Sequence, residues 1–139
     1  MPSDLDLYYE LSYYTLAHSS PSFIHQHIVD AFTAQQADAG TKPIAIVFAL
    51  IGLYLHVERN FTGRQVQKAH MQMAKKRKLW PGLPLPKERG NITVGDVLAA
   101  AQGQSRDELI HQWCVSVWNS WAQSREQIVA LARSELDIG

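Results

Sequence analysis

The residues whose types could do chemistry first gather in the run "SFIHQHIVDAF", residues 22–32. It holds two histidines, His25 and His27, and one carboxylate, Asp30. Imidazole and carboxylate groups bind divalent metals such as zinc, iron or manganese, and they also serve as general acids and bases. The run therefore raises the hypothesis of metal binding or of histidine-based proton transfer.

Helix geometry shows that this run cannot form a metal site by itself. Five residues advance an α-helix by roughly 500°, so His25 and Asp30 point about 140° apart and cannot chelate one ion. Gln26 and Asp30 are four residues apart and share a face. Any site that uses these residues needs side chains from other helices.

Two further candidates lie on other segments. His70 falls between Val66 and Met73 on the inward face of an amphipathic segment, and Glu58 closes an apolar one. Bundle metal centres are built from such residues on facing helices. The sequence predicts a pocket that binds a divalent metal or a small polar ligand, with these roles: metal ligands His25 and His70, catalytic carboxylates Asp30 and Glu58.

A simpler interpretation stands beside each of these roles. The two histidines could be hydrogen-bonded interior residues, and the two carboxylates could cap helices or form salt bridges. The other histidines match no pattern, and we expect them at the solvent boundary: His18, His56 and His111. If the protein is an enzyme, metal-assisted or histidine-based acid–base chemistry is the available class.

The elements that must position these residues all read as helices. Ser3 precedes a segment with acidic residues in its first turn, capping boxes begin at Thr62 and Ser105, and Thr93 with Asp96 is a close relative. No segment alternates with period two, so we predict an all-α, single-domain bundle over residues 1–139. The apolar run "IAIVFALIGLYL" should form the most buried helix. A proline-rich loop precedes the fifth helix. Six helices are expected, at residues 4–18, 21–37, 43–58, 62–77, 93–102 and 105–135.

Composition narrows the possible settings. Cys114 is the only cysteine, the start lacks a secretory pattern, and the longest apolar run is too short for a bilayer that needs about 20 residues. We therefore expect a cytoplasmic protein without a membrane segment. The net charge is zero, but residues 59–89 carry nine Lys/Arg and one Glu, a net of +8. This segment, which includes "KKRK", predicts weak binding of a polyanion, or service as a non-catalytic interaction module.

The last predicted helix runs without Pro or Gly to Leu136, longer than the other helices can cover. It could bend near "QSR" or extend toward a partner. If it extends, an end that carries Ile128, Leu131 and Ala132 would expose an apolar patch, and a homodimer through this C-terminal helix would bury it. The tryptophans earlier on the same segment are expected in the core.

Several fragments, in order, resemble an uncharacterised bacterial family of small all-helical proteins, a domain of unknown function. They are "HQ" followed by "VDA", "LHVER", "AH", "LW" before the proline loop, "TVGDVL" and "SVWNSW". The resemblance spans about Tyr9 to Ile128 and implies no activity. Its matched polar and aromatic positions are His25, Gln26, Asp30, Glu58, His70, Trp118 and Trp121.

Overall fold

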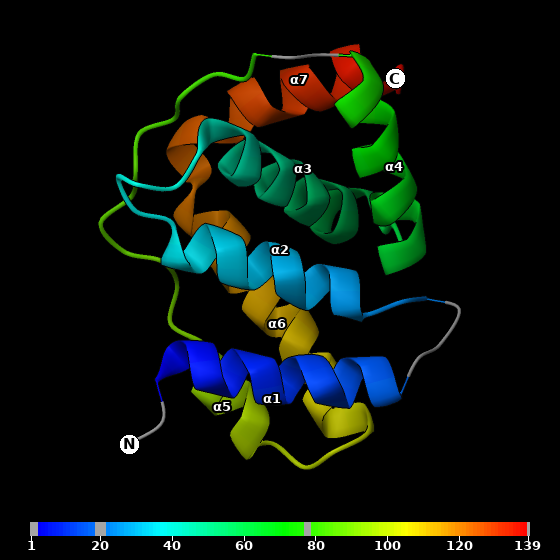
Figure 1. Cartoon of the computed structure of the whole chain (residues 1–139), viewed down its shortest axis with the longest axis vertical. Helices are drawn as coiled ribbons and strands as arrows, with labels where there is room; N and C mark the ends of the chain where they lie inside the picture. The colour runs from blue at the N-terminus through cyan, green and yellow to red at the C-terminus, as the bar shows by residue number, and fades with distance from the viewer. Residues whose placement is uncertain (1–2, 19–21, 77–78, 139) are drawn as a thin grey trace.

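The computed structural model describes residues 3–18, 22–76 and 79–138, and within them it is an all-α single domain, as predicted (Figure 1). The segment between α4 and α5 is irregular, as its prolines predict. The described helices are α1 (Asp4–Ala17), α2 (His25–Gln36), α3 (Pro43–Arg59), α4 (Gly63–Lys76), α5 (Val94–Ala99), α6 (Gln104–Ser120), the short 3₁₀ helix η1 (Ala122–Ser124) and α7 (Arg125–Leu136).

The core is organised around α3, which contacts α2, α4, α6 and α7. Nine residues of this helix are buried, in agreement with its apolar sequence. The predicted core tryptophans on α6 and just beyond it are buried as well: Trp113, Trp118 and Trp121. In contrast, α1 packs only on α2 and α5 among the pairs with extensive contact, so it forms an outer layer at one end (Figure 1).

Three of the four predicted helix-start signals are capping boxes in the structure, those at Ser3, Thr62 and Thr93. The hydroxyls of Ser3 and Thr93 each accept a hydrogen bond from a backbone amide of the first turn. The side chains of Asp6 and Asp96 in turn accept hydrogen bonds from the backbone amides of Ser3 and Thr93. Thr62 and Gln65 bond to each other's backbone amides in the same way. The prediction at Ser105 is wrong, because α6 begins one residue earlier, after Gly103 with φ of 95°.

The junction between α2 and α4 explains why α2 begins later than predicted. The expected start at residue 21 lies outside the described residues, and the helix begins at His25 after Phe23, whose φ is 55°. The start of α4 packs on this turn: Arg64 N–H donates to the Ser22 carbonyl at 3.2 Å. A Cβ on Gly63 would lie 1.7 Å from the Phe23 carbonyl oxygen, so only glycine fits.

The segment predicted as one helix over residues 105–135 is divided at Trp121 into α6, η1 and α7. Of the two possibilities for this segment, a bend or an extension toward a partner, the structure shows the bend. After the bend, α7 folds back onto α3 and α4. Ile128 and Ala132 are therefore 0 % exposed, and Leu131 is only partly exposed. The expectation of an uncovered apolar end was wrong, because the bend supplies an intramolecular partner for it.

No helix within the described ranges has both the length and the apolar character that crossing a bilayer would require.

Candidate functional site

The structure gives each of the two predicted metal ligands a hydrogen-bond partner of its own. His25, the first residue of α2, has its Nδ1 atom 2.9 Å from the Thr15 hydroxyl of α1. His70 on α4 has its Nε2 atom 2.7 Å from the Phe48 carbonyl oxygen of α3. Because a carbonyl only accepts, Nε2 of His70 carries the proton, and the lone pair of the neutral ring is on Nδ1. These contacts match the interpretation as hydrogen-bonded interior histidines.

Asp30 is buried in the contact between α2 and α3. Its Oδ1 atom accepts a 3.1 Å hydrogen bond from Gln26 Nε2, and Oδ2 has no hydrogen-bond partner among the described residues. A Cβ on Gly52 would lie 2.0 Å from Oδ2, so glycine at this position is what makes room for the carboxyl group. Burial raises the pKa of Asp30 well above its usual value, which favours the neutral acid.

Glu58 lies at the end of α3 and joins the bend between α6 and α7. It accepts a hydrogen bond from the indole of Trp118 at 2.7 Å and forms an ion pair with Arg125, whose Nε lies 2.8 Å away. The hydrogen bond from Arg125 is the main reason that the pKa of Glu58 is lowered. Both oxygens of this carboxylate are therefore engaged in holding α7 to α3.

The second matched tryptophan, Trp121, also serves the bend. It is 1 % exposed, and the guanidinium of Arg89 lies 5.3 Å from the centroid of its ring. Together with Glu58 and Trp118, it packs where the chain turns back. The aromatic and carboxylate positions shared with the resembling family thus serve the packing of the helices in this structure.

Three other histidines, from three different helices, do meet. His27 of α2 stacks on His56 of α3, with ring centroids 3.6 Å apart and planes inclined by 20°. His111 of α6 stands edge-on to His56 at a centroid distance of 5.0 Å. Its Nδ1 atom lies 3.1 Å from Nε2 of His56. We call these three residues the histidine cluster.

The backbone fixes which nitrogen of His56 carries a lone pair. His56 Nδ1 lies 3.3 Å from the Phe61 carbonyl oxygen, so Nδ1 is the donor and Nε2 of the neutral ring is unprotonated. That lone pair points at His111. A histidine held in this way, through one nitrogen bound to a carbonyl, is typical of metal-ligating histidines.

Burial keeps the inner rings of the cluster neutral. Desolvation, followed by repulsion from the neighbouring histidines, lowers the pKa of His27 to about 3. Desolvation likewise lowers the pKa of His56 to about 4, with repulsion from His111 adding to it and the hydrogen bond to Phe61 opposing it. Nδ1 of His27 is buried and has no partner among the described residues. At neutral pH both rings therefore offer uncharged nitrogen atoms.

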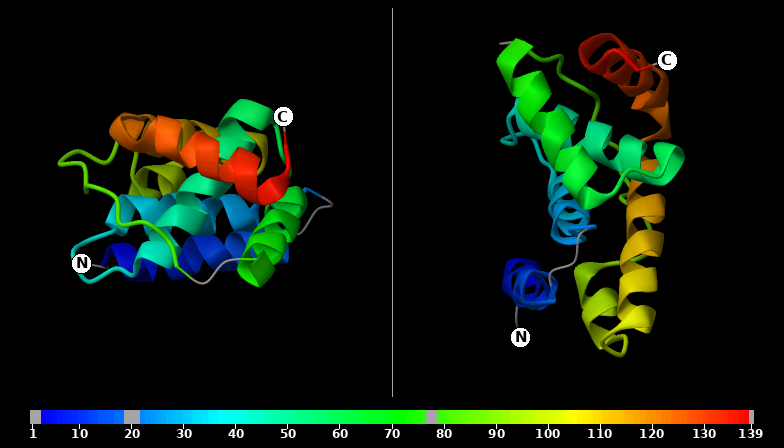
Figure 2. Two further views of the ribbon diagram at one scale, coloured as in Figure 1. Left: turned by 90° about the horizontal axis from the view of Figure 1, so that it is seen from above. Right: turned by 90° about the vertical axis from the view of Figure 1, so that its right-hand side faces the viewer.

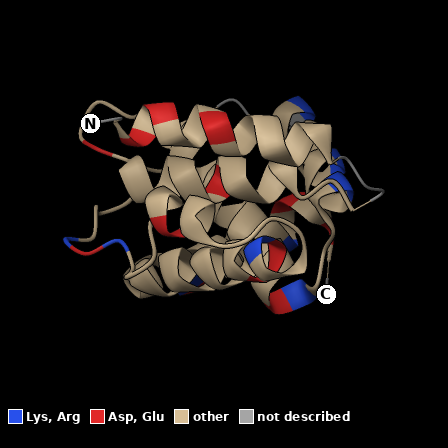
Figure 3. Ribbon diagram, turned by 90° about the horizontal axis from the view of Figure 1, so that it is seen from below, with Lys and Arg blue, Asp and Glu red and all other residues tan. Residues whose placement is uncertain are grey.

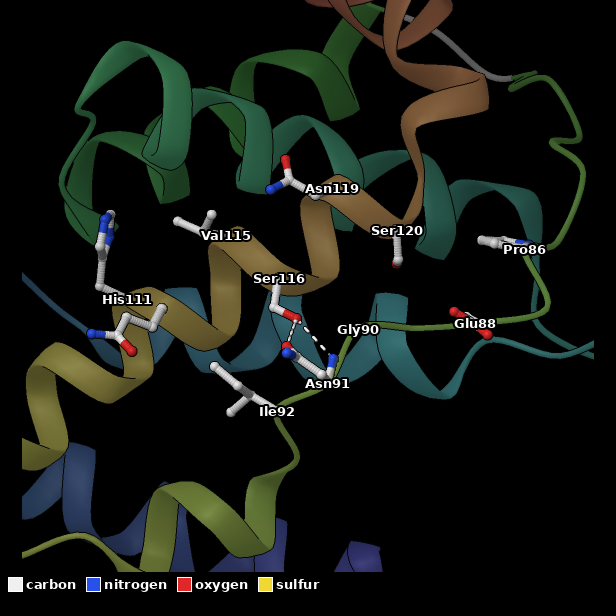
Figure 4. A pocket seen from close by; sticks show the side chains of 11 residues that line it. Pro86, Glu88, Gly90, Asn91, Ile92, His111, Val115, Ser116, Asn119 and Ser120 are labelled. Atoms are coloured by element: carbon white, nitrogen blue, oxygen red, sulfur yellow. Dashed lines mark hydrogen bonds between the residues drawn. The ribbon is translucent and has the colours of Figure 1, made fainter.

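The exposed member, His111, lies at one end of an open groove of about 880 Å³. The groove runs between α6 and the loop of residues 86–92, and Figure 4 places Glu88 toward the opposite end from His111. A hydrogen bond from Ser116 to the Asn91 side chain, at 2.9 Å, ties the loop to α6. The lining combines polar side chains with apolar surface. The polar residues are Glu88, Asn91, His111, Gln112, Ser116, Asn119 and Ser120, and the apolar ones include Pro86, Ile92 and Val115.

Among the described residues, no group of three or more His, Cys, Asp or Glu side chains is arranged to hold a metal ion. The histidine cluster offers one pair of convergent nitrogens, on His56 and His111, with the third ring stacked behind them. What this arrangement can do is bind one cation through two imidazoles, or pass a proton between two neutral imidazoles.

The sequence pattern did not predict this cluster, since His56 and His111 were expected only as residues at the solvent boundary. His111 is exposed and His56 is partly exposed, as expected, but the ring of His56 also stacks on His27. One sequence signal was present: Glu108 stands three residues before His111, the Glu-x-x-His spacing used by helical metal centres. No comparable signal links His27 or His56 to it.

The ordered sequence fragments suggested membership of an uncharacterised helical family. In a comparison with known protein families, one family model matches residues 5–122. The chain belongs to the family of unknown function DUF5946. The match to DUF5946 includes all three residues of the histidine cluster and ends within the bend before α7. No curated protein and no solved structure matches the chain.

Proposed function

We propose that this protein binds a divalent metal ion through His56 and His111, and that open positions on the ion hold a small polar ligand in the adjoining groove. The observation that carries the proposal is the 3.1 Å separation between His56 Nε2 and His111 Nδ1, with the His56 lone pair fixed by the Phe61 carbonyl. This keeps the ligand class inferred from the sequence but uses different histidines.

The separation of the two nitrogens suits shared coordination. Two ligand nitrogens at about 2.0–2.1 Å from a zinc ion lie about 2.9 Å apart at a right angle and about 3.4 Å apart at the tetrahedral angle. The observed 3.1 Å falls between these limits. Without an ion, His111 Nδ1–H donates to His56. With one, His111 uses the tautomer protonated at Nε2.

Zinc is the favoured ion among zinc, iron and manganese, because two neutral imidazoles suit it better than the oxygen-preferring manganese. Two protein ligands leave positions for water and for a ligand in the groove. Catalytic zinc sites also keep an open position, but beside three protein ligands, so a third ligand would complete such a site. Glu108, exposed on the same face of α6 one turn before His111, is the nearest sequence candidate for a third ligand. A metal-bound water would be the reactive group if the protein is an enzyme.

The experiment is a calorimetric titration of untagged, EDTA-stripped protein with Zn²⁺. We expect one equivalent to bind, at least tenfold weaker binding in His111→Ala and in His56→Gln, and unchanged binding in the control His18→Ala. Loss of binding in His25→Asn and His70→Asn, with His111→Ala unaffected, would instead support the pocket predicted from the sequence. Absence of binding in the wild type would refute the proposal.

The second candidate is the interaction module that uses the basic segment. It is supported by the outer face of α4, where Arg64, Lys68 and Lys75 are exposed and follow steps of four and seven residues. We also place the protein in the cytoplasm, on the support of its single, buried Cys114. Dimerisation through the C-terminal helix was inferred from an exposed apolar patch at its end. The structure does not support that inference, because α7 buries its apolar residues within the chain.

A further inference from the structure

The outer face of α1 carries an apolar stripe that nothing in the described chain covers. Leu5 is 48 % exposed, Tyr9 60 %, Tyr13 77 % and Leu16 53 %. Steps of four, four and three residues place all four on one face of the helix. The opposite face is occupied, since Leu11 and Tyr14 are buried. This stripe is the largest gathering of exposed apolar side chains on one described helix.

The stripe is large enough to be an interaction surface. A tyrosine side chain buries roughly 150–250 Å² when covered, so the exposed parts of Tyr9 and Tyr13 alone amount to about 250 Å². With Leu5 and Leu16 added, the patch reaches the range of about 300–600 Å² found for the largest patches of monomers, which are often functional. The surface that covers this stripe must also be complementary to the charges beside the stripe on α1.

The charge around the stripe is negative. Helix α1 contains Asp4, Asp6 and Glu10 and no Lys or Arg, and Figure 3 shows the acidic positions along its N-terminal half. Glu10 is exposed and follows Asp6 by one turn along one edge of the stripe. The complementary surface must therefore be basic, with apolar side chains that can meet the tyrosines.

The outer face of α4 has this character. Arg64, Lys68 and Lys75 are exposed along one row, and Met71, in the same row, is 58 % exposed. No ion pair joins Lys68 or Lys75 to another described residue. The row thus presents positive charge around an apolar side chain. It is the counterpart of the acidic, apolar row on α1.

The two helices lie on the same side of the molecule. In both views of Figure 2, α1 and α4 occupy one side and α6 and α7 the other. A two-fold axis that lies in the plane of the side that α1 and α4 share, between the two helices, would turn this side onto itself in a second copy. It would place α1 of one copy on α4 of the other and form the same contact a second time. Pairing α1 with α1, or α4 with α4, would instead bring like charges together.

We propose that two copies of this chain form a two-fold dimer in which the stripe on α1 packs on the basic row of α4 of the other copy. Each copy buries both its α1 stripe and its α4 row, so the dimer covers four patches in total. This brings the buried area closer to the roughly 800 Å² per partner of a standard interface. The acidic row of α1 and the basic row of α4 then neutralise each other between copies.

The test is sedimentation equilibrium of the full chain between about 5 and 500 µM, with charge reversals at exposed residues of each row. We expect a wild-type dimer that weakens with added salt, because rim charges are screened. Glu10→Lys places Lys against the basic row, and Lys68→Glu places Glu against the acidic row. Each should raise the Kd at least tenfold, whereas the exposed control Glu126→Lys on α7 should leave it unchanged.

Recombining the reversals identifies the partner helix. In an equimolar mixture of the two single variants, both contacts of the mixed dimer pair opposite charges, and the same holds for the double variant with itself. We expect both to return to within about threefold of the wild-type Kd. A monomeric wild type, a dimer indifferent to the reversals, or reversals that are not rescued in combination would each overturn the proposal. Circular dichroism confirms that every variant is folded.

Discussion

Acidification should destabilise this protein through the histidine cluster, well before its carboxylates are fully protonated. His27 is 5 % exposed, and its pKa is lowered to about 3, while that of His56 is lowered to about 4. Unfolding returns both imidazoles to water, where their pKa is about 6.5. The unfolded chain therefore binds protons that the native chain does not, and stability falls as the pH drops below about 6.5.

The size of the loss follows from the two pKa values. At pH 5 an unfolded histidine is almost fully protonated and the native ones are not, which costs about 2 kcal/mol for each residue by linkage. His27 and His56 together would remove roughly 4 kcal/mol between pH 7.5 and 5, a large part of the 5–15 kcal/mol typical of a domain. Asp30 acts in the opposite direction, because its raised pKa makes the native state bind a proton more readily as the pH falls.

The assay is urea unfolding, followed by tryptophan fluorescence, at several pH values between 7.5 and 5 in the presence of EDTA. His27→Gln should reduce the loss over this interval by about 2 kcal/mol. Asp30→Asn should steepen the loss, because it removes the opposing group. His18→Gln, at an exposed position, is the matched control. Parallel stability curves for His27→Gln and the wild type would refute the assignment of the acid sensitivity to the cluster.

Two further predictions concern other parts of the chain. Gly52→Ala should destabilise the protein by about 1–3 kcal/mol, because the new Cβ would lie 2.0 Å from Asp30 Oδ2 and the packing must open. The midpoint of urea unfolding measures this loss, and Asp30→Ala in the same chain should recover part of it if this contact is the cause. The basic segment should bind DNA weakly at low salt and lose that binding near physiological salt, because a few phosphate contacts weaken steeply with ionic strength. Fluorescence anisotropy with a short DNA duplex measures this binding. Tight, salt-resistant binding would instead make nucleic acid the main partner.

The helices could be read from the sequence because local signals determine them. The capping boxes at Ser3, Thr62 and Thr93 mark helix starts in the structure as they do in the sequence. The bend at Trp121 had no such signal, since neither Pro nor Gly stands there. It is stabilised by contacts remote in sequence, chiefly Glu58 with Trp118 and Arg125. Those contacts decide whether residues 125–136 extend outward or fold back.

The candidate site could be predicted only as a class of side chains. Spacing along one helix shows which residues share a face, as it does for Gln26 and Asp30, whose side chains bond in the structure. It does not show which faces of different helices meet. His27, His56 and His111 come together because α2, α3 and α6 pack against one another, and that packing follows from the apolar surfaces of all three helices.

The orientation of His56 links the fold to the proposed chemistry. Helix α3 ends at Asn60, whose φ of 57° turns the chain, and the Phe61 amide bonds back to the Leu55 carbonyl at 3.0 Å. This helix end places the Phe61 carbonyl beside Nδ1 of His56, one turn before the end. The turn between α3 and α4 therefore directs the Nε2 lone pair at His111 through the backbone alone. A nitrogen held by backbone geometry is already oriented before any ion arrives. His70 is held in the same way by the Phe48 carbonyl, and His56 differs from it in facing a second imidazole at 3.1 Å.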